Sequence, residues 1–263
     1  MTRVREFAGA LNRLVDYPRP PKGFPCPEPV WFGAIYRARN TAIVEKLLVP
    51  VAGQQWDIHL WALDALSPPL ERYTSGVGPG GKFDLLQRLL DRSPPTPSSW
   101  VVLSDDDYLM RRGTLAQLVA LTKASGFDLA QPAHRRFVNV SHHITLVRPR
   151  VVARRTHFVE IGPVIVMSPL AQSKLLPFPT AWMGWGVEML WSRASLNGEI
   201  HLGIVDAVTV EHLHPPGIRY DIDAARDEQE HFLNQAGIRS YSDVQTNVAW
   251  WRRPRSAPDW TIR

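Results

Sequence analysis

Three consecutive carboxylates, Asp105, Asp106 and Asp107, follow an apolar run that reads Trp-Val-Val-Leu-Ser. The apolar residues predict a buried strand, and the aspartates come where that strand would end. Adjacent anions repel one another, so the cluster favours a hard divalent cation such as Mg²⁺ or Mn²⁺ that neutralises the charge. A solvated acidic turn is the alternative interpretation. The strand end favours the cation, because open α/β sheets bind ligands outside the carboxyl ends of their strands.

Two later segments carry further chemical groups in a fixed order. Gly-Trp-Gly-Val-Glu occupies residues 184–188, and Val-Glu-His-Leu-His occupies 210–214. With the aspartates, this order resembles the metal-dependent, nucleotide-sugar-using glycosyltransferases of GT-A fold. Asp105-Asp106-Asp107 fits their D-x-D motif, residues 184–188 resemble the acceptor-side W-G-x-E/D segment, and 210–214 resemble a later metal-binding histidine. Residues 128–134 and 154–168 also resemble a poorly characterised branch of that superfamily, and the resemblance runs from about Val30 to Gly217.

The resemblance implies Mn²⁺ or Mg²⁺ as the cofactor. Asp105 and Asp107 are the outer members of D-x-D, with Asp107 as the direct ligand and Asp105 as a candidate for a ribose or water-mediated contact. We place Asp106 with the nucleotide contacts, although alternation along an extended chain turns it the other way. His212 is the first candidate for the histidine ligand and His214 the second, since both would share one face of a strand. The alternative is that both are ordinary polar residues at a strand end.

The resemblance implies that Glu188 is the general base that deprotonates the acceptor hydroxyl, in a direct displacement with inversion. Partial burial beside tryptophan would suit a carboxylate to this task by raising its pKa toward neutrality. A carboxylate that interacts with the helix dipole is the alternative explanation for a glutamate at this place. Asp206 and Glu160 are reserve candidates for the base.

In the implied fold, the nucleotide lies against the ends of the first two strands. The candidate contacts are Tyr36, which could stack on the base, Arg37, Arg39 and Asp64. Lys82 follows Gly80-Gly81, where backbone N–H groups could approach a diphosphate that the lysine also reaches. An ordinary glycine turn is the alternative interpretation of that segment.

The expected acceptor side is aromatic, since sugar faces pack well on indole rings. Tryptophans cluster near Glu188, and the acceptor contacts that we predict are Trp182, Trp185, Gly186 and His157, with Trp191 nearby. His142, His143 and His157 could form a metal cluster by composition. Neighbouring histidines on a strand face opposite ways, so we interpret these three as acceptor-pocket or structural residues.

The elements that must position these groups alternate along the chain. Hydrophobic patterning predicts strands at 30–36, 55–63, 100–110, 127–131 and 200–210, further extended segments at 142–147 and 156–167, and helices at 40–49, 82–90, 114–124, 185–196 and 224–236. A proline- and glycine-rich loop is expected at 67–81. The predicted fold class is α/β, with a GT-A (Rossmann-like), mostly parallel central sheet and helices on both faces.

At 263 residues, the chain fits one catalytic domain with flanking segments. We expect an N-terminal extension at 1–29 with a short helix at 3–16, a single domain at 30–240 and a C-terminal tail at 241–263. Cys26 is the only cysteine, which excludes an internal disulfide. No stretch is apolar enough for a signal peptide or a transmembrane segment, so the expected location is the cytoplasm.

The leading hypothesis is a glycosyltransferase whose partners are a nucleotide-diphosphate sugar donor and a sugar or small-molecule acceptor. A metal-dependent phosphohydrolase or nucleotidyltransferase would also use an acidic cluster with a histidine. A nucleic-acid-binding module is the non-enzymatic alternative, suggested by the net charge of +5 and the Trp-Trp-Arg-Arg-Pro-Arg segment at 250–255. Dispersed positive charge and the three aspartates, which would repel phosphates, argue against nucleic acid.

Overall fold

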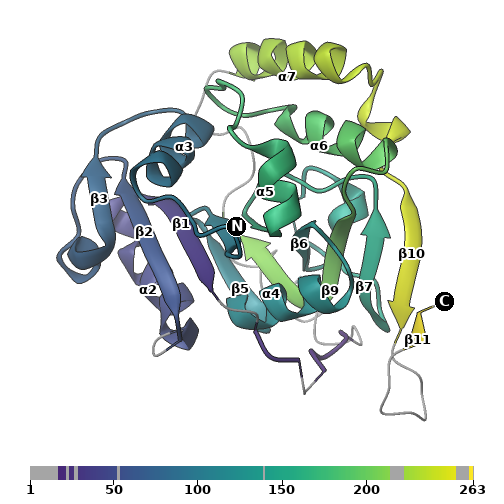
Figure 1. Ribbon diagram of the computed structural model, residues 1–263, viewed down its shortest axis with the longest axis horizontal. Coiled ribbons are helices and arrows are strands. Elements are labelled where there is room, and N and C mark those ends of the chain that lie inside the picture. The colour runs from purple at the N-terminus through teal and green to yellow at the C-terminus, as the bar shows by residue number, and fades with distance from the viewer. Residues whose placement is uncertain are drawn as a thin grey trace.

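The computed structural model describes residues 17–21, 24–26, 29–51, 54–138, 140–213, 222–252 and 261–262. The strands in these ranges form one sheet with helices packed against it (Figure 1). The helix expected at 3–16 lies outside the described residues. Within the described part of the chain, no helix is both long enough and apolar enough to cross a membrane.

The first part of the chain alternates strands with helices, as the sequence predicts. The elements are β1 (Val30–Tyr36), α2 (Thr41–Leu48), β2 (Trp56–Ala62), α3 (Lys82–Arg92) and β4 (Trp100–Ser104). Short 3-10 turns at Ala38–Asn40 and Val49–Val51 flank α2. The predicted elements at 30–36, 40–49, 55–63 and 82–90 are therefore confirmed, with their ends shifted by at most two residues.

The loop expected at 67–81 contains regular structure, so that prediction is wrong in part. A 3-10 segment at Pro68–Tyr73 leads into β3 (Thr74–Val77), which pairs in parallel with β2 at the sheet edge. The Trp61 indole donates a hydrogen bond to the Gly78 carbonyl at 2.8 Å and fastens this edge. A strand of four residues is too short to leave a periodic pattern in a segment rich in proline and glycine.

The second part of the chain supplies the remaining elements. They are β5 (Tyr108–Arg112), α4 (Leu115–Ala124), β6 (Leu129–His134), β7 (Val151–Thr156), β8 (Val164–Met167), α5 (Pro169–Leu175), α6 (Val187–Leu196), β9 (Leu202–His212), α7 (Ile222–Ala236), β10 (Asn247–Arg252) and β11 (Thr261–Ile262), with 3-10 turns at His143–Thr145 and Tyr241–Asp243. The helices expected at 114–124, 185–196 and 224–236 and the strands at 127–131 and 200–210 are confirmed. Thr114 and Gln117 form the capping box that begins α4.

Three expected extended segments differ from the structure. In the segment at 100–110, β4 ends at Ser104, just before the aspartates, as expected, but the residues from Tyr108 onward form a separate strand, β5, which pairs with β9. The segment at 156–167 holds only the end of β7 and the whole of β8, joined by a loop at 157–163. The segment at 142–147 is a 3-10 turn, which Thr145 closes by donating its backbone N–H and its hydroxyl to the His142 carbonyl.

The strands follow the order β11-β10-β7-β9-β6-β8-β4-β1-β2-β3, with β5 paired to β9 off this path. From the pairings, β1, β2, β3, β4, β6, β9 and β10 run in one direction, and β5, β7, β8 and β11 run in the other. The carboxyl ends of β1, β2, β4, β6 and β9 therefore meet at one edge of the sheet. That edge is where a ligand site is expected in an open α/β sheet.

Alternate side chains of β1 enter two separate cores, one on each face of the sheet. Val30 and Phe32 belong to a core that includes residues of α2 and α4. Trp31 and Ile35 belong to another that includes residues of α3, α5 and α6. Side chains that alternate along a strand point to opposite faces, so this division shows that helices cover both faces of the sheet, as predicted.

The segment at 241–263, expected to be a tail, contributes strands to the sheet. β10 pairs antiparallel with β7, and Trp250 lies opposite Arg154. Trp251 is buried and packs edge-on against Phe127, with ring centroids 5.1 Å apart. The sheet thus continues past residue 240.

Candidate functional site

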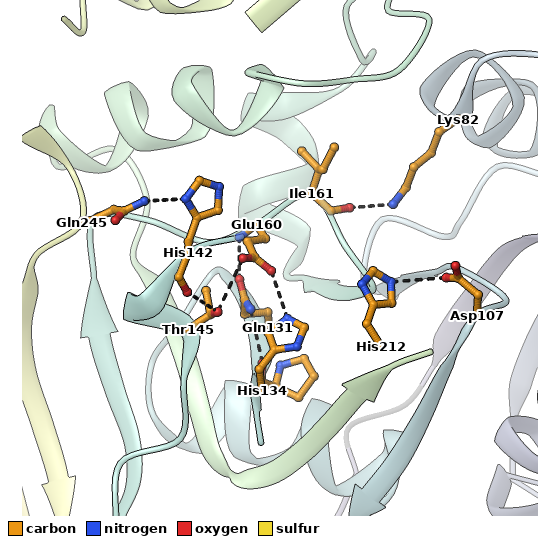
Figure 2. A network of polar contacts seen from close by, with 11 residues as sticks. Lys82, Asp107, Gln131, His134, His142, Thr145, Glu160, Ile161, His212 and Gln245 are labelled. Carbon is orange, nitrogen blue, oxygen red and sulfur yellow. Dashed lines mark hydrogen bonds and ion pairs between the residues drawn. The ribbon is translucent and has the colours of Figure 1, made fainter. Parts of the chain in front are cut away.

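The turn after β4 brings the aspartates to the end of β9. Tyr108, which begins β5, is buried, and its hydroxyl shares a hydrogen bond of 2.9 Å with the Ser104 hydroxyl. Tyr108 lies opposite His212 in the β5–β9 pairing, and the Leu213 N–H donates to the Asp107 carbonyl at 2.9 Å. These contacts place His212 Nε2 3.2 Å from Asp107 Oδ1 (Figure 2).

Asp105, Asp107 and His212 form a group that could hold a metal ion, called the triad below. One ligand atom from each lies within 4.8 Å of the others, and all three side chains are half-buried. Two carboxylate oxygens and one imidazole nitrogen suit Mn²⁺ and are compatible with Mg²⁺. The donor set therefore fits the cofactor that the sequence analysis expects. His214, the second histidine candidate, lies outside the described residues.

The triad is a site of negative potential. Burial by itself would lower the pKa of the His212 imidazole. The hydrogen bond and charge of Asp107, with the charges of Asp105 and Glu160, outweigh this effect and raise the pKa above its ordinary value. Surroundings that favour a proton on His212 also favour a cation beside it.

Asp106 points away from the triad, as alternation predicts. Its Oδ2 accepts hydrogen bonds from the Arg37 backbone N–H at 2.6 Å and from Asn40 Nδ2 at 3.0 Å. Burial raises the pKa of Asp106, and the two hydrogen bonds oppose that rise. These hydrogen bonds connect the turn after β1 to the end of β4. Asp106 is 3% exposed, so it is not open to a nucleotide.

Tyr36, the residue expected to stack on a base, is fully buried in the core. Its hydroxyl pairs with Thr74 Oγ1 at 3.0 Å and accepts the Ser67 N–H at 3.2 Å. The stacking prediction is therefore wrong for this structure. The last residue of β1 alternates into the core face of the strand, and strand position alone did not reveal which face that was.

The other predicted nucleotide contacts surround the turn after β1. Arg37 has a side chain that is 40% exposed, and Arg39 is exposed. Asp64 Oδ1 accepts the N–H groups of Ala38 at 2.9 Å and Ala65 at 2.8 Å. The hydrogen bond from Ala38 holds the pKa of Asp64 below its ordinary value. These three residues line the carboxyl ends of β1 and β2, where a nucleotide was expected.

Lys82 lies beside the triad. It begins α3, and its Nζ is 2.6 Å from Asp105 Oδ1 and donates to the Ile161 carbonyl at 2.8 Å. A Cβ at Gly162 would overlap the Asp105 carboxylate, so the backbone after Ile161 forms a wall against that aspartate. The fold thus brings the Lys82 ammonium group into contact with the Asp105 carboxylate, although the two residues belong to different elements.

The loop that precedes Glu188 is held between α3 and α7. Gly184 and Gly186 have φ of 82° and 91°, and a Cβ at Gly186 would lie 2.9 Å from the Gln229 backbone. The Glu228 carboxylate accepts the N–H groups of Trp182, Met183 and Gly184 at 2.6, 3.0 and 2.7 Å. The role of Glu228 leaves no signal in the sequence, because its three partners are backbone groups.

The predicted acceptor tryptophans divide between surface and core. Trp182 is 64% exposed and Trp185 is half-buried, so both are open to a ligand. Trp191 is 1% exposed and packs against Phe83, so it is a core residue and not an acceptor contact. His157 Nδ1 pairs with Ser195 Oγ at 3.0 Å, and burial lowers the His157 pKa. Ser195 is the seventh residue after Glu188 in α6, about 10 Å along the helix axis, which places His157 apart from Glu188.

Glu188 is a buried carboxylate with two hydrogen-bond donors. It is 4% exposed; its Oε2 accepts the Gly186 N–H at 3.1 Å and its Oε1 accepts the Tyr241 hydroxyl at 2.8 Å. Burial raises the pKa of Glu188 to about 7, against the lowering effect of these hydrogen bonds. Tyr241 lies in the segment expected as a tail, which is why the sequence did not connect it with Glu188.

The two reserve candidates have different surroundings. Asp206 is fully buried and ion-paired with Arg154 at 3.0 Å, so it is a structural residue within the sheet. Glu160 lies in the loop before β8, and its Oε2 is 3.0 Å from His134 Nε2 at the end of β6 (Figure 2). His134 was not singled out as a site residue, because the strand predicted at 127–131 ends three residues before it, whereas β6 extends to His134. Its partner could not be deduced from that position.

No protein-family model and no curated protein matches this chain. Among solved structures, GalNAc-T7 with UDP, GalNAc and Mn²⁺ is similar over 78% of this chain, with a TM-score of 0.56 and 10% identity. The mannosyltransferase PcManGT from Pyrobaculum calidifontis, in complex with GDP-Man and Mn²⁺, is similar over 89% of this chain and 71% of its own, with a TM-score of 0.51 and 16% identity. The matched part is 47% of the GalNAc-T7 chain, about half its length. These likenesses show that the chain has the GT-A fold.

Proposed function

We propose that this chain is a glycosyltransferase that moves a sugar from a nucleotide-diphosphate sugar to a hydroxyl acceptor. The observation that carries the proposal is the meeting of Asp105, Asp107 and His212 at the carboxyl edge of a GT-A sheet. GalNAc-T7 was solved with UDP and Mn²⁺, and PcManGT with GDP-Man and Mn²⁺, and both share this fold. By analogy, the proposed donor is a nucleotide-diphosphate sugar and the proposed cofactor is Mn²⁺ or Mg²⁺.

Asp105, Asp107 and His212 would hold the cation. When bound, it would stabilise the negative charge that develops on the diphosphate as the glycosidic bond breaks. Lys82, whose Nζ is 2.6 Å from Asp105, would place a further positive charge beside that diphosphate. Arg37, whose side chain is 40% exposed, and the exposed Arg39, with Asp64, would contact the rest of the nucleotide along the ends of β1 and β2.

Glu188 is the proposed base, which would make the transfer a direct displacement with inversion. A pKa of about 7 gives a carboxylate that is partly ionised near neutral pH and able to take the hydroxyl proton. Trp182, Trp185 and Gly186 precede it in the same loop and are the proposed acceptor contacts. His157 remains only a proposed contact at the margin of this region, since it pairs with Ser195.

A thermal-shift panel tests the donor site. UDP, GDP and their sugar conjugates are added with and without Mn²⁺ to the wild type, to Asp107→Ala and to the control Asp227→Ala, whose side chain is exposed on α7. A ligand that binds only the native state raises its stability by RT ln(1 + [L]/Kd), about 2.7 kcal/mol at a hundredfold excess over Kd. We expect one nucleotide to stabilise the wild type and the control only with Mn²⁺, and to leave Asp107→Ala unshifted.

The competing functions give other results in the same experiment and its follow-up. If no nucleotide shifts the wild type under any metal, the transferase proposal is wrong, and salt-sensitive binding to random oligonucleotides would indicate the nucleic-acid module instead. A phosphohydrolase or nucleotidyltransferase would bind nucleotide with metal but would release phosphate or join a nucleotidyl group without transferring sugar. Analysis of the products by mass separates those activities from glycosyl transfer.

A further inference from the structure

Glu160 is the centre of a buried polar network that the proposed mechanism does not use. Its Oε2 accepts a hydrogen bond from His134 Nε2 at 3.0 Å, since an ionised carboxylate cannot donate. The Gln131 side-chain oxygen accepts the Glu160 backbone N–H, and the Thr145 hydroxyl approaches Glu160 Oε1 at 3.5 Å. Figure 2 shows these side chains converging from β6 and from the loops around it. The network therefore fixes the carboxylate in one place.

That place lies beside the triad. Ile161, the next residue, accepts a hydrogen bond from Lys82, and the Pro163 carbonyl accepts the Asp105 N–H at 2.8 Å. On the other side, the ring of His134 is 6.2 Å from the ring of His212. The loop that carries Glu160 is thus attached to one ligand of the triad, and the partner of Glu160 neighbours another.

Glu160 also lies toward the proposed base. The Thr145 hydroxyl that approaches Glu160 Oε1 also donates to the His142 carbonyl, and the ring of His142 stacks on the ring of Tyr241 with centroids 4.6 Å apart. Tyr241 in turn donates to Glu188 at 2.8 Å, so the contacts of Glu160 lead to the triad on one side and to the proposed base on the other. During the transfer, the sugar must occupy this interval, because its anomeric carbon is bonded to the diphosphate and is approached by the acceptor hydroxyl.

The chemistry of Glu160 suits binding better than proton transfer. Burial would raise its pKa, but the charge and hydrogen bond of His134, with the charges of His142 and His212, hold the pKa below its ordinary value. The carboxylate therefore stays ionised near neutral pH and is a weak base. Among the residues that the structure describes, Oε1 has only the long contact with Thr145, and the side chain is 12% exposed, so it can still accept from a ligand hydroxyl.

We propose that Glu160, positioned by His134, accepts hydrogen bonds from hydroxyl groups of the donor sugar and selects neutral sugars over uronic acids. The inference rests on the proposed transferase function and specifies its donor. A uronic acid would bring a second carboxylate toward an ionised one in a partly buried site, where like charges repel strongly. A neutral sugar instead offers hydroxyl groups that can donate hydrogen bonds to Glu160 Oε1.

Calorimetric binding with Mn²⁺ tests the proposal on the full chain. The ligands are UDP, UDP-glucose and UDP-glucuronic acid, with the corresponding GDP and GDP-mannose pair. The proteins are the wild type, Glu160→Gln and the control Glu230→Gln, which changes an exposed glutamate on α7. The quantity compared is the ratio of Kd for the nucleotide sugar to Kd for the same nucleoside diphosphate, which isolates the contribution of the sugar.

We expect Glu160→Gln to raise that ratio about tenfold for the neutral sugar, as loss of one hydrogen bond to a charged group would do. The Kd for the nucleoside diphosphate should stay within about twofold, and Glu230→Gln should match the wild type. The wild type should bind UDP-glucuronic acid more weakly than UDP-glucose, a comparison that needs no variant and stands even if Glu160→Gln does not fold.

The outcomes separate this proposal from the function on which it rests. Wild type that binds no nucleoside diphosphate overturns the transferase function and the inference with it. Nucleotide binding with an unchanged ratio in Glu160→Gln leaves the function standing and overturns the role of Glu160. Equal or tighter binding of the uronic acid conjugate by the wild type overturns the selectivity.

Discussion

At the scale of single residues, neighbouring carboxylates in this site differ in their contacts and in their pKa values, because their surroundings differ. Asp105 and Asp107 face His212 and form the triad, while Asp106 faces the turn after β1 and accepts the Arg37 N–H. Glu160 and Glu188 are both buried, yet the pKa of Glu160 is lowered and that of Glu188 is raised to about 7. The difference follows from their partners: a histidine donates to Glu160, whereas a neutral tyrosine donates to Glu188.

This difference predicts the pH dependence of the transfer. Glu188 is protonated below its folded-state pKa of about 7 and cannot then accept a proton, so the rate should fall about tenfold per pH unit below pH 7. The Tyr241 hydrogen bond lowers the Glu188 pKa, so Tyr241→Phe should move the acidic limb to higher pH. Initial rates from pH 5 to 9 measure the limb. Tyr73→Phe is the control, and an acidic limb that Tyr241→Phe leaves in place would remove Glu188 from the role of base.

At the scale of elements, the loop before α6 is shaped by the helices on either side of it. Gly184 contacts Phe83 of α3, and Gly186 meets the backbone of α7. Glu228 of α7 binds three consecutive N–H groups of the same loop. The position of Glu188, two residues after Gly186, therefore depends on α7 as well as on its own helix.

Two glycines with similar φ separate the effect of this packing from that of backbone conformation. Gly186 has φ of 91° with the Gln229 backbone 2.9 Å from an added Cβ, whereas Gly198 has φ of 76° with open space around it. Gly198→Ala should lower the free energy of unfolding by about 1 kcal/mol, the cost of placing a residue with a Cβ in the left-handed conformation. Gly186→Ala should cost distinctly more of the free energy of unfolding, because helix backbone must also move. Urea unfolding of both variants measures the two losses in free energy of unfolding. Equal losses would show that the α7 backbone can move away from residue 186 at no cost.

At the scale of the whole molecule, a buried ion pair between β7 and β9 also connects these strands to β10. Arg154 of β7 and Asp206 of β9 are fully buried and 3.0 Å apart. Arg154 also donates to Asn247 Oδ1 of β10 at 2.9 Å and to the Leu146 carbonyl at 2.9 Å. Burial raises the pKa of Asp206 to about 6, against the lowering effect of Arg154. This network holds β10 and the segment before β7 against the sheet that carries the triad.

Removing the negative charge of this pair should destabilise the fold without touching the site. Asp206→Asn would leave the Arg154 guanidinium buried without its counter-ion, at a cost of about 3–5 kcal/mol in the free energy of unfolding. Asp227→Asn, on the exposed side of α7, should change it by no more than about 0.5 kcal/mol. Urea midpoints give both values. A small effect of Asp206→Asn would mean that water or another group compensates Arg154.

The sequence by itself determined the alternation of strands and helices and the position of the acidic cluster at a strand end. Both are local: hydrophobic periodicity sets the elements of β1 to β4 and their helices, and the chain order places Asp105 to Asp107 directly after β4. The order of the aspartates, Glu188 and His212 also indicated a GT-A fold, which the structure has. Short elements such as β3 and the turn at 143–145 were not predicted, because they are too short to show a hydrophobic period.

Only the tertiary structure decided which side chains meet. Asp107 meets His212 because β5 pairs with β9, and Lys82 reaches Asp105 from the start of α3. Glu160, in the loop before β8, meets His134 at the end of β6. It also buried Tyr36, which strand position had suggested for the nucleotide. Periodicity tells which residues of one element share a face, but which face is buried and what lies opposite depend on pairings between distant segments. Those pairings arise from packing of the whole chain, so they could not be deduced from any one stretch of it.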